Sequence, residues 1–238
     1  MKVSLFVPCI INHLMPDSAF SAINVLEKCG VSVGVEKFQV CCGQPAYNMG
    51  IYDHAKIFAE KFVRLYEKAS CDKIVVLSGS CVSMIKKNYK SLFLGQAPSW
   101  LEKVSEFSEF LYSEGLYKKL KLKYRGAVFY HKSCHLLNEL EIDKEPKSIL
   151  SSINGLKIIE AKWHENTCCG FGGAFAATLP DLSIDIGNSK LDFILSKGVN
   201  NIIAGDAGCI THLKSLAMAC DYKLNFYYMA DFLDMCSN

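Results

Sequence analysis

The stretch Ile74-Val75-Val76-Leu77-Ser78-Gly79-Ser80-Cys81 decides how this chain is organised, because a related stretch follows later in the sequence. The second copy is Ile202-Ile203-Ala204-Gly205-Asp206-Ala207-Gly208-Cys209, displaced by 128 residues (209 − 81). In each copy an apolar run, the pattern of a strand buried on both faces, leads through a small turn to a cysteine. The sequence therefore indicates two copies of one unit.

Three further anchors repeat in the same order along the chain. Cys9 and Cys134 each follow an apolar run and are 125 residues apart (134 − 9). The other two pairs are Cys41-Cys42-Gly43-Gln44 with Cys168-Cys169-Gly170-Phe171, and Glu109-Phe110-Leu111 with Asp231-Phe232-Leu233. The repeat predicts two halves, residues 1–124 and 125–238, with no flexible linker between them.

Strand and helix patterns alternate within each half. Strands are expected over 3–7, 31–40 and 73–77, and over 126–130, 156–160 and 201–204; helices are expected over 17–29 and 52–69. The amphipathic run 100–111 is expected to belong to the core. This alternation predicts an α/β fold with a parallel sheet and flanking helices in each half, with ligands bound beyond the carboxyl ends of the strands.

Composition excludes several classes of protein. The 26 Lys and Arg against 24 Asp and Glu give a net charge of +2, whereas a nucleic-acid binder normally carries a strong basic excess. No apolar run reaches the roughly 18 residues that a transmembrane segment needs. The 12 cysteines are too sparse for a small disulfide scaffold. We expect a cytoplasmic protein whose reduced thiols serve metal or redox chemistry.

The cysteines divide into two classes. Cys29, Cys71, Cys220 and Cys236 have no counterpart in the other half, and we expect them to be structural, with Cys29 and Cys220 as small buried hydrophobic residues late in helices. The other eight follow strands at matching positions, where core packing would not demand sulfur. These predicted metal ligands are Cys9, Cys41, Cys42, Cys81, Cys134, Cys168, Cys169 and Cys209.

Three chemistries compete for the eight thiols. Structural zinc usually takes four thiolates from two short CxxC pairs, whereas long gaps separate these cysteines and Cys41 and Cys42 are adjacent. A vicinal disulfide would be strained, and the CxxC motif of thiol–disulfide enzymes is absent. A cluster of several irons is wider and accepts adjacent thiolates at different irons. The spacing favours an iron–sulfur cluster and leaves zinc and disulfide chemistry as alternatives.

Glycines and histidines surround these cysteines. The tract Gly170-Phe171-Gly172-Gly173 contains GxG but not the full dinucleotide fingerprint. We expect Gly43, Gly170, Gly172 and Gly173 to bind the cofactor by letting backbone N–H groups approach its sulfurs. His131 and His135 flank Cys134, and a hydrogen-bonded scaffold role is favoured over ligation for both.

The motifs together resemble those of a known family. Cys-Cys-Gly, preceded and followed at a distance by a further cysteine, occurs twice and is similar to the cysteine-rich CCG-domain proteins. These include the cysteine-rich subunit of heterodisulfide reductase and the iron–sulfur subunit of glycolate oxidase. Ser78-Gly79-Ser80-Cys81, His131-Lys132-Ser133-Cys134-His135 and Cys168-Cys169-Gly170-Phe171-Gly172-Gly173 resemble the lactate-utilisation protein A group in particular. The resemblance covers nearly the whole chain.

The resemblance implies an oxidoreductase subunit that helps oxidise L-lactate, a small 2-hydroxy acid, to pyruvate together with partner subunits. It also implies iron–sulfur clusters, which are of the [4Fe–4S] type in the heterodisulfide reductase branch. There a CxxC pair follows the CCG motif, whereas here Ser78 and Asp206 replace its first cysteine. Both are harder oxygen donors, and Asp206, ionised at neutral pH, is the better candidate ligand of the two.

Two hypotheses about function remain. In the first, the chain is an iron–sulfur electron-transfer subunit, with lactate oxidised on a partner or at a shared interface and an iron–sulfur or ferredoxin-like subunit nearby. Arg64 and Arg125 are the only arginines that could clamp a carboxylate, and no nicotinamide or flavin fingerprint occurs. In the second, it is a zinc- or disulfide-containing scaffold for assembly with redox partners. The doubled adjacent cysteine pair favours the first.

Overall fold

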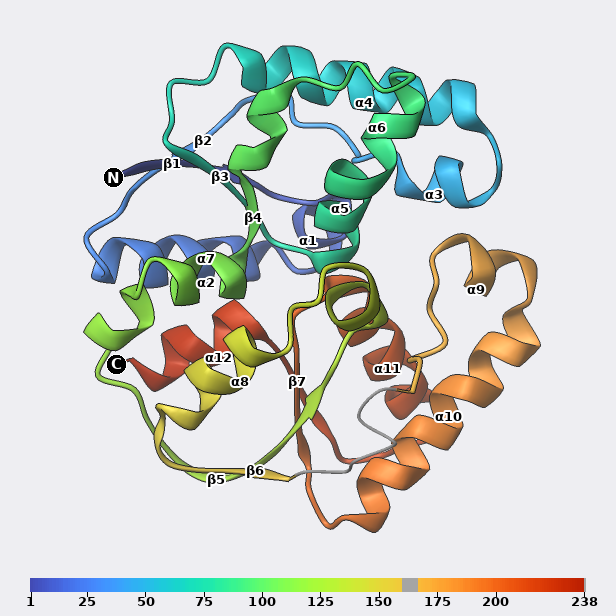
Figure 1. Cartoon of the computed structure of the whole chain (residues 1–238). Helices are drawn as coiled ribbons and strands as arrows, with labels where there is room; N and C mark the ends of the chain where they lie inside the picture. Colours follow the sequence, from blue (N-terminus) through green and yellow to red (C-terminus); the bar gives the residue numbers. More distant parts are fainter. Residues whose placement is uncertain (160–166, 238) are drawn as a thin grey trace.

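The computed structural model of the chain describes residues 1–159 and 167–237. Within them lie two parallel sheets of four strands, one in each half, with helices packed around them (Figure 1). The strand order is β2-β1-β3-β4 in the first sheet and β6-β5-β7-β8 in the second. Because the second order repeats the first, the predicted α/β architecture with two pseudo-symmetric halves is confirmed.

The first half alternates strands and helices from β1 to α7. Its strands are β1 (Lys2–Phe6), β2 (Ser32–Val35), β3 (Lys73–Val76) and β4 (Val104–Glu106). Its helices are α1 (Cys9–Leu14), α2 (Pro16–Lys28), α3 (Gln44–Asn48), α4 (Tyr52–Glu67), α5 (Gly79–Ser83), α6 (Tyr89–Leu92) and α7 (Phe107–Ser113), with a π-helical turn at Met84–Asn88 and 3₁₀ turns at Ser99–Lys103 and Leu116–Lys119.

The second half repeats this alternation with fewer helices among the described residues. Its strands are β5 (Lys123–His131), β6 (Asn154–Ile159), β7 (Asn201–Ala204) and β8 (Asn225–Tyr228). Its helices are α8 (Lys144–Ser151), α9 (Ala174–Thr178), α10 (Pro180–Ser196), α11 (Ala207–Ala219) and α12 (Met229–Cys236), with a π-helical turn at His135–Glu139.

Each sheet has one strand more than the sequence pattern predicted. The additional strands β4 and β8 contain three and four residues, too few to display a clear period. Within the run 100–111 the apolar side chains Leu101, Val104, Phe107, Phe110 and Leu111 are buried as expected, but the run is divided into a 3₁₀ turn, β4 and α7. The strand expected over 31–40 is limited to β2, and the one expected over 156–160 is present as β6, with Glu160 outside the described residues.

The two halves contact each other reciprocally. Helix α2 of the first half packs against α12 of the second. Their equivalents are α8 in the second half and α7 in the first, and these two helices also pack against each other. In the same way α1 packs on α11, and α5 packs on the π-helical turn His135–Glu139. Figure 1 shows α2, α7, α8 and α12 stacked between the two sheets. Reciprocal contacts are those of a twofold arrangement, so a pseudo-twofold axis relates the halves.

The apolar core is continuous across this contact. Leu5 of the first half and Phe232 of the second belong to one cluster of fully buried side chains. At its edge the Ser18 hydroxyl donates a hydrogen bond of 2.7 Å to Asp231 Oδ2. The division predicted after residue 124 stays a prediction, and that position lies within β5.

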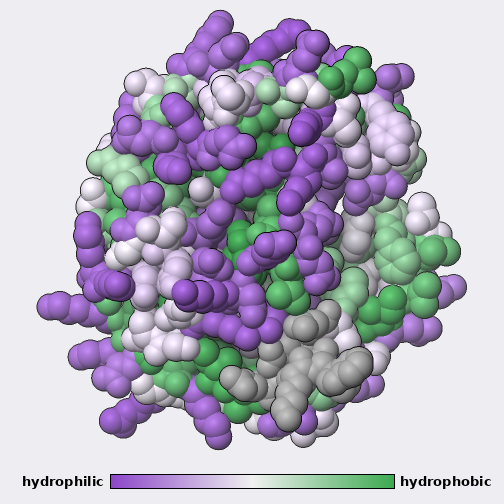
Figure 2. Space-filling model, in the orientation of Figure 1, coloured by the Kyte–Doolittle hydropathy of each residue, from purple (hydrophilic) through white to green (hydrophobic). Residues whose placement is uncertain are grey.

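The surface is mostly hydrophilic on the face shown in Figure 2, with hydrophobic side chains gathered over α9 and α10. Leu179 and Leu182, at the start of α10, are 51% and 49% exposed. Among the described helices, none combines the length and the apolar character needed to span a membrane.

Candidate metal centre

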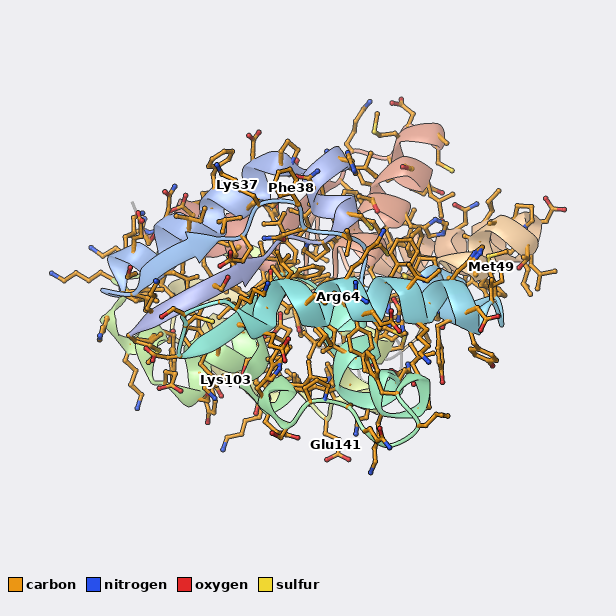
Figure 3. The ribbon with its side chains drawn as sticks, turned by 90° about the horizontal axis from the view of Figure 1, so that it is seen from above. Lys37, Phe38, Met49, Arg64, Lys103 and Glu141 are labelled. Carbon is orange, nitrogen blue, oxygen red and sulfur yellow. The ribbon has the colours of Figure 1, made fainter. Side chains whose placement is uncertain are left out.

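All eight repeated cysteines line a single cavity of about 390 Å³ between the two halves. They reach it because each follows the carboxyl end of a strand or the loop beyond it, and the pseudo-twofold axis turns those ends toward each other. Met49, which follows α3 and is labelled in Figure 3, also lines the cavity, and α3 contacts α9. The structure thus brings together every cysteine that the repeat singled out, and their role as ligands stays a prediction.

The four cysteines of the first half form one connected set of thiols, defined here as the first set. Cys9 hydrogen-bonds to Cys41, Cys41 to Cys42, and Cys42 to Cys81. Cys42 and Cys81 are buried, whereas Cys9 and Cys41 are half-buried. The hydrogen bond with Cys41, together with burial, raises the pKa of the Cys9 thiol. The contacts follow the order of the chain and join residues from three separate segments.

The four cysteines of the second half form the equivalent second set. Cys169 Sγ and Cys209 Sγ are 3.1 Å apart, and both residues are buried. Cys134 hydrogen-bonds to Cys168, which raises the pKa of Cys134 and lowers that of Cys168. The Cys169 thiol and the Gly170 N–H add to the lowering at Cys168. The second set can therefore hold negative charge on the sulfur of Cys168, its exposed member.

The same glycine turn follows each Cys-Cys pair. Gly43 and Gly170 both have φ of +90°, a conformation that favours glycine. Their N–H groups donate to Cys41 Sγ at 3.4 Å and to Cys168 Sγ at 3.3 Å. The turn thus aims a backbone N–H dipole at a cysteine sulfur in each half. Gly172 and Gly173 line the cavity, and cofactor binding by all four glycines stays a prediction.

Ser78 and Asp206 stand at matching helix starts and contact each other. Ser78 is the N-cap residue of α5 and Asp206 that of α11. Asp206 Oδ2 accepts hydrogen bonds from Ser78 Oγ at 2.9 Å and Ser80 N at 2.8 Å, and Oδ1 accepts one from Gly208 N at 3.0 Å. Both oxygens are thus engaged with the protein. The geometry gives Asp206 a role in joining the halves, while its ligation of iron stays a prediction.

The two histidines beside Cys134 have different environments. His135 spans the halves through a 2.9 Å contact between its Nε2 and Gln44 Nε2, consistent with the expected scaffold role. His131 is 1% exposed, and neither of its ring nitrogens has a hydrogen-bond partner among the described residues. Burial and the nearby Lys190 charge lower the pKa of His131 to about 3, so the ring is neutral. A scaffold role based on hydrogen bonds therefore does not apply to His131.

The four cysteines without a counterpart lie outside the cavity lining. Cys29 and Cys236 are buried, and Cys71 is half-buried. Cys220 is exposed, so the prediction that it is a buried hydrophobic residue is wrong. It follows the last residue of α11, where the chain turns at the surface.

Comparison with known proteins agrees with this arrangement. A model of the CCG cysteine-rich domain matches residues 3–86 and 128–214, one copy in each half. Lactate utilization protein A 2 of Bacillus cereus (strain Q1) is 34% identical over 220 residues, covering 90% of this chain and 89% of the relative. Lactate utilization protein A of Exiguobacterium sp. is 31% identical over 240 residues, covering 98% and 97%.

A solved glutamate racemase of Bacillus anthracis aligns over 98% of this chain and 79% of its own at 9% identity. The TM-score of that alignment is 0.39, which supports no conclusion. The sequence relationships, by contrast, span almost the full length of both proteins. The chain therefore belongs to the family of cysteine-rich CCG-domain proteins and, within it, to the lactate utilization protein A group.

Proposed function

We propose that this chain is the iron–sulfur, electron-carrying subunit of a system that oxidises L-lactate to pyruvate. The observation that carries the proposal is the cavity in which two sets of four thiols face each other. Relatives named lactate utilization protein A supply the link to lactate. The proposal places the chain in the reducing cytoplasm, where cysteines stay out of disulfide bonds, as all 12 do in the structure.

The donor set suits an iron–sulfur cluster better than a single metal ion. Each set offers four sulfurs, two of them from adjacent residues, which reach different irons of a wide cluster more readily than one tetrahedral ion. Cys9, Cys41, Cys42 and Cys81 would hold one cluster, and Cys134, Cys168, Cys169 and Cys209 the other. A bound cluster of this kind supplies one-electron redox chemistry.

The surrounding residues control charge and water at these thiols. The N–H groups of Gly43, Gly170 and Phe171 donate to cysteine sulfurs over 3.3 to 3.5 Å, which stabilises thiolate charge. The inner cysteines of each set, Cys42 and Cys81 in the first and Cys169 and Cys209 in the second, are buried and therefore shielded from water. Tyr89 fixes the first Cys-Cys pair by donating from its hydroxyl to the carbonyl oxygen of Cys42 at 3.0 Å.

Among the described residues, no basic side chain of the cavity lining is placed to clamp the lactate carboxylate. Its described lining contains neither Lys nor Arg, and its one carboxylate, Asp206, would repel the substrate. Arg64 lies on the outer helix α4 (Figure 3), where it pairs with Glu60 at 3.6 Å. Arg125 is exposed on β5. We therefore assign lactate binding and oxidation to partner subunits, with this chain receiving electrons.

Anaerobic metal analysis tests the proposal. We expect iron and acid-labile sulfide in protein purified without air, and a visible absorption that bleaches when lactate is added together with the partner subunits. Lactate added to this chain alone should leave the absorption unchanged. Zinc in place of iron after anaerobic reconstitution would favour a metal scaffold and refute the proposal.

A further inference from the structure

The repeat supplies an internal reference for His131. Ser4 of β1 pairs with Ile74 of β3, and Phe129 of β5 pairs with Ile202 of β7, so the two sheets share one register. Two residues further along, Phe6 in the first half therefore corresponds to His131 in the second. At this strand end the first half therefore has a phenyl ring and the second half an imidazole.

The phenyl ring has an ordinary structural role. Phe6 is fully buried and packs edge-on against Phe62 and Tyr66, with ring centroids 5.3 Å and 6.2 Å away. A hydrophobic ring is what a buried strand end requires. An imidazole at the equivalent position brings two polar nitrogens into the same kind of environment. Packing alone gives no reason for them.

Those nitrogens are unpaired within the described part of the chain. His131 is 1% exposed, and both Nδ1 and Nε2 lack a hydrogen-bond partner there. Buried polar atoms are normally satisfied, so an orphaned pair requires an explanation. A ring nitrogen of His131 and the sulfurs of Cys169 and Cys209 all lie within 4.8 Å of one another. The unsatisfied imidazole therefore stands beside the second set.

The other candidate donor at the second set is already occupied. Asp206 accepts hydrogen bonds on both oxygens from Ser78, Ser80 and Gly208. We infer that His131, through a ring nitrogen, is the additional ligand of the cluster held by the second set. The inference rests on the proposed iron–sulfur function and extends it to one named residue.

The two clusters are then chemically different. The first set has only thiolates, because Phe6 offers no donor, whereas the second combines thiolates with a neutral imidazole. Histidine ligation raises the reduction potential of iron–sulfur centres. The second cluster is thus the better electron acceptor of the two, which gives electrons a direction within the chain.

Nitrogen hyperfine spectroscopy tests this inference. Protein containing ring-¹⁵N histidine is reconstituted anaerobically with iron and sulfide, reduced and examined by pulsed electron paramagnetic resonance. We expect a histidine-nitrogen coupling that is lost in His131→Phe, which copies the residue of the first half. His135→Phe is the matched control, because His135 adjoins Cys134 but already contacts Gln44, and it should retain the coupling.

The outcomes separate the inference from the proposed function. Iron and sulfide at wild-type levels without any nitrogen coupling, or a coupling that survives in His131→Phe, would overturn the ligand assignment and leave the electron-carrier proposal intact. Absence of iron would overturn both. If His131→Phe does not fold, loss of the coupling in His135→Phe would overturn the assignment, and its retention would support it.

Discussion

Ser78 Oγ donates a 2.9 Å hydrogen bond to Asp206 Oδ2, and the two residues occupy the same position in the two halves of the chain. Contact between repeat partners places them beside the pseudo-twofold axis. The cysteines that follow them, Cys81 and Cys209, consequently face a common cavity. This one bond therefore marks the point where two separate cysteine motifs become one site.

Removing this bond should destabilise the contact between the halves. Ser78→Ala leaves the buried Asp206 carboxylate without one of its donors, and we expect a loss of about 2 kcal/mol in the free energy of unfolding. Urea denaturation of the metal-free, reduced protein measures it. Ser215→Ala, on the exposed face of α11, is the control and should change stability by less than about 0.5 kcal/mol. Equal losses of stability in Ser78→Ala and Ser215→Ala would show that the Ser78 hydrogen bond does not stabilise the contact between the halves.

The role of Asp206 can be separated from iron ligation. Asp206→Asn keeps one acceptor oxygen but removes the charge, and we expect lower stability with unchanged iron content after anaerobic reconstitution. Iron and protein assays on the same sample give the number of iron atoms per protein chain. A drop to roughly half the wild-type iron, as for loss of one of two clusters, would show that the carboxylate is a ligand.

The two cysteine classes should respond differently to substitution. Cys81→Ala and Cys209→Ala each remove an inner thiol of one set, and we expect iron content to fall by roughly half. Cys71→Ala and Cys220→Ala lie outside the cavity lining and should leave iron nearly intact. Similar losses from all four variants would contradict the division based on the repeat.

The glycine turns should differ in their tolerance of a side chain. A Cβ at Gly170 would lie 2.3 Å from the Ser183 carbonyl oxygen, whereas nothing lies within 4 Å of one at Gly173. Gly170→Ala should cost about 3 kcal/mol or more, because the clash adds to the cost of its positive φ, whereas Gly173→Ala meets only the cost of its positive φ and should destabilise less. Thermal unfolding of the two variants provides the comparison, and equal melting temperatures would argue against the clash.

Glu106 makes stability depend on pH. Burial raises its pKa from 4.5 to about 7, although its carboxylate accepts N–H groups of Ser108 and Glu109 at the start of α7. Between these values the unfolded chain has released the proton that the folded chain still holds, so rising pH favours unfolding. We expect the wild type to lose about 3 kcal/mol more than Glu106→Gln between pH 4.5 and 7.

The measurement is the free energy of unfolding of both proteins across that pH range, with metal removed and thiols reduced. Other groups titrate in both proteins, so only the difference between the two curves reports on Glu106. Parallel curves would show that Glu106 ionises normally.

The α/β architecture and the division of the cysteines into two sets follow from the sequence alone. Apolar runs at constant offsets predicted matching parallel sheets, and strand ends in such sheets are where Cys9, Cys81, Cys134 and Cys209 stand. These features are local, because each depends on the burial of a few consecutive residues and on the turn that follows them. The short strands were not predicted for the same reason, since β4 has too few residues to show a pattern.

The way in which the two halves meet depends on packing between separate parts of the chain. The offsets do not reveal that the two sets share one cavity, that Ser78 binds Asp206, or that His131 is buried without a partner among the described residues. These relationships arise from the reciprocal packing of α2 with α12 and of α7 with α8. Such packing depends on the shapes of surfaces formed by segments that are separated in the sequence, as Ser18 of α2 is from Asp231 of α12, and no periodicity along the chain encodes it.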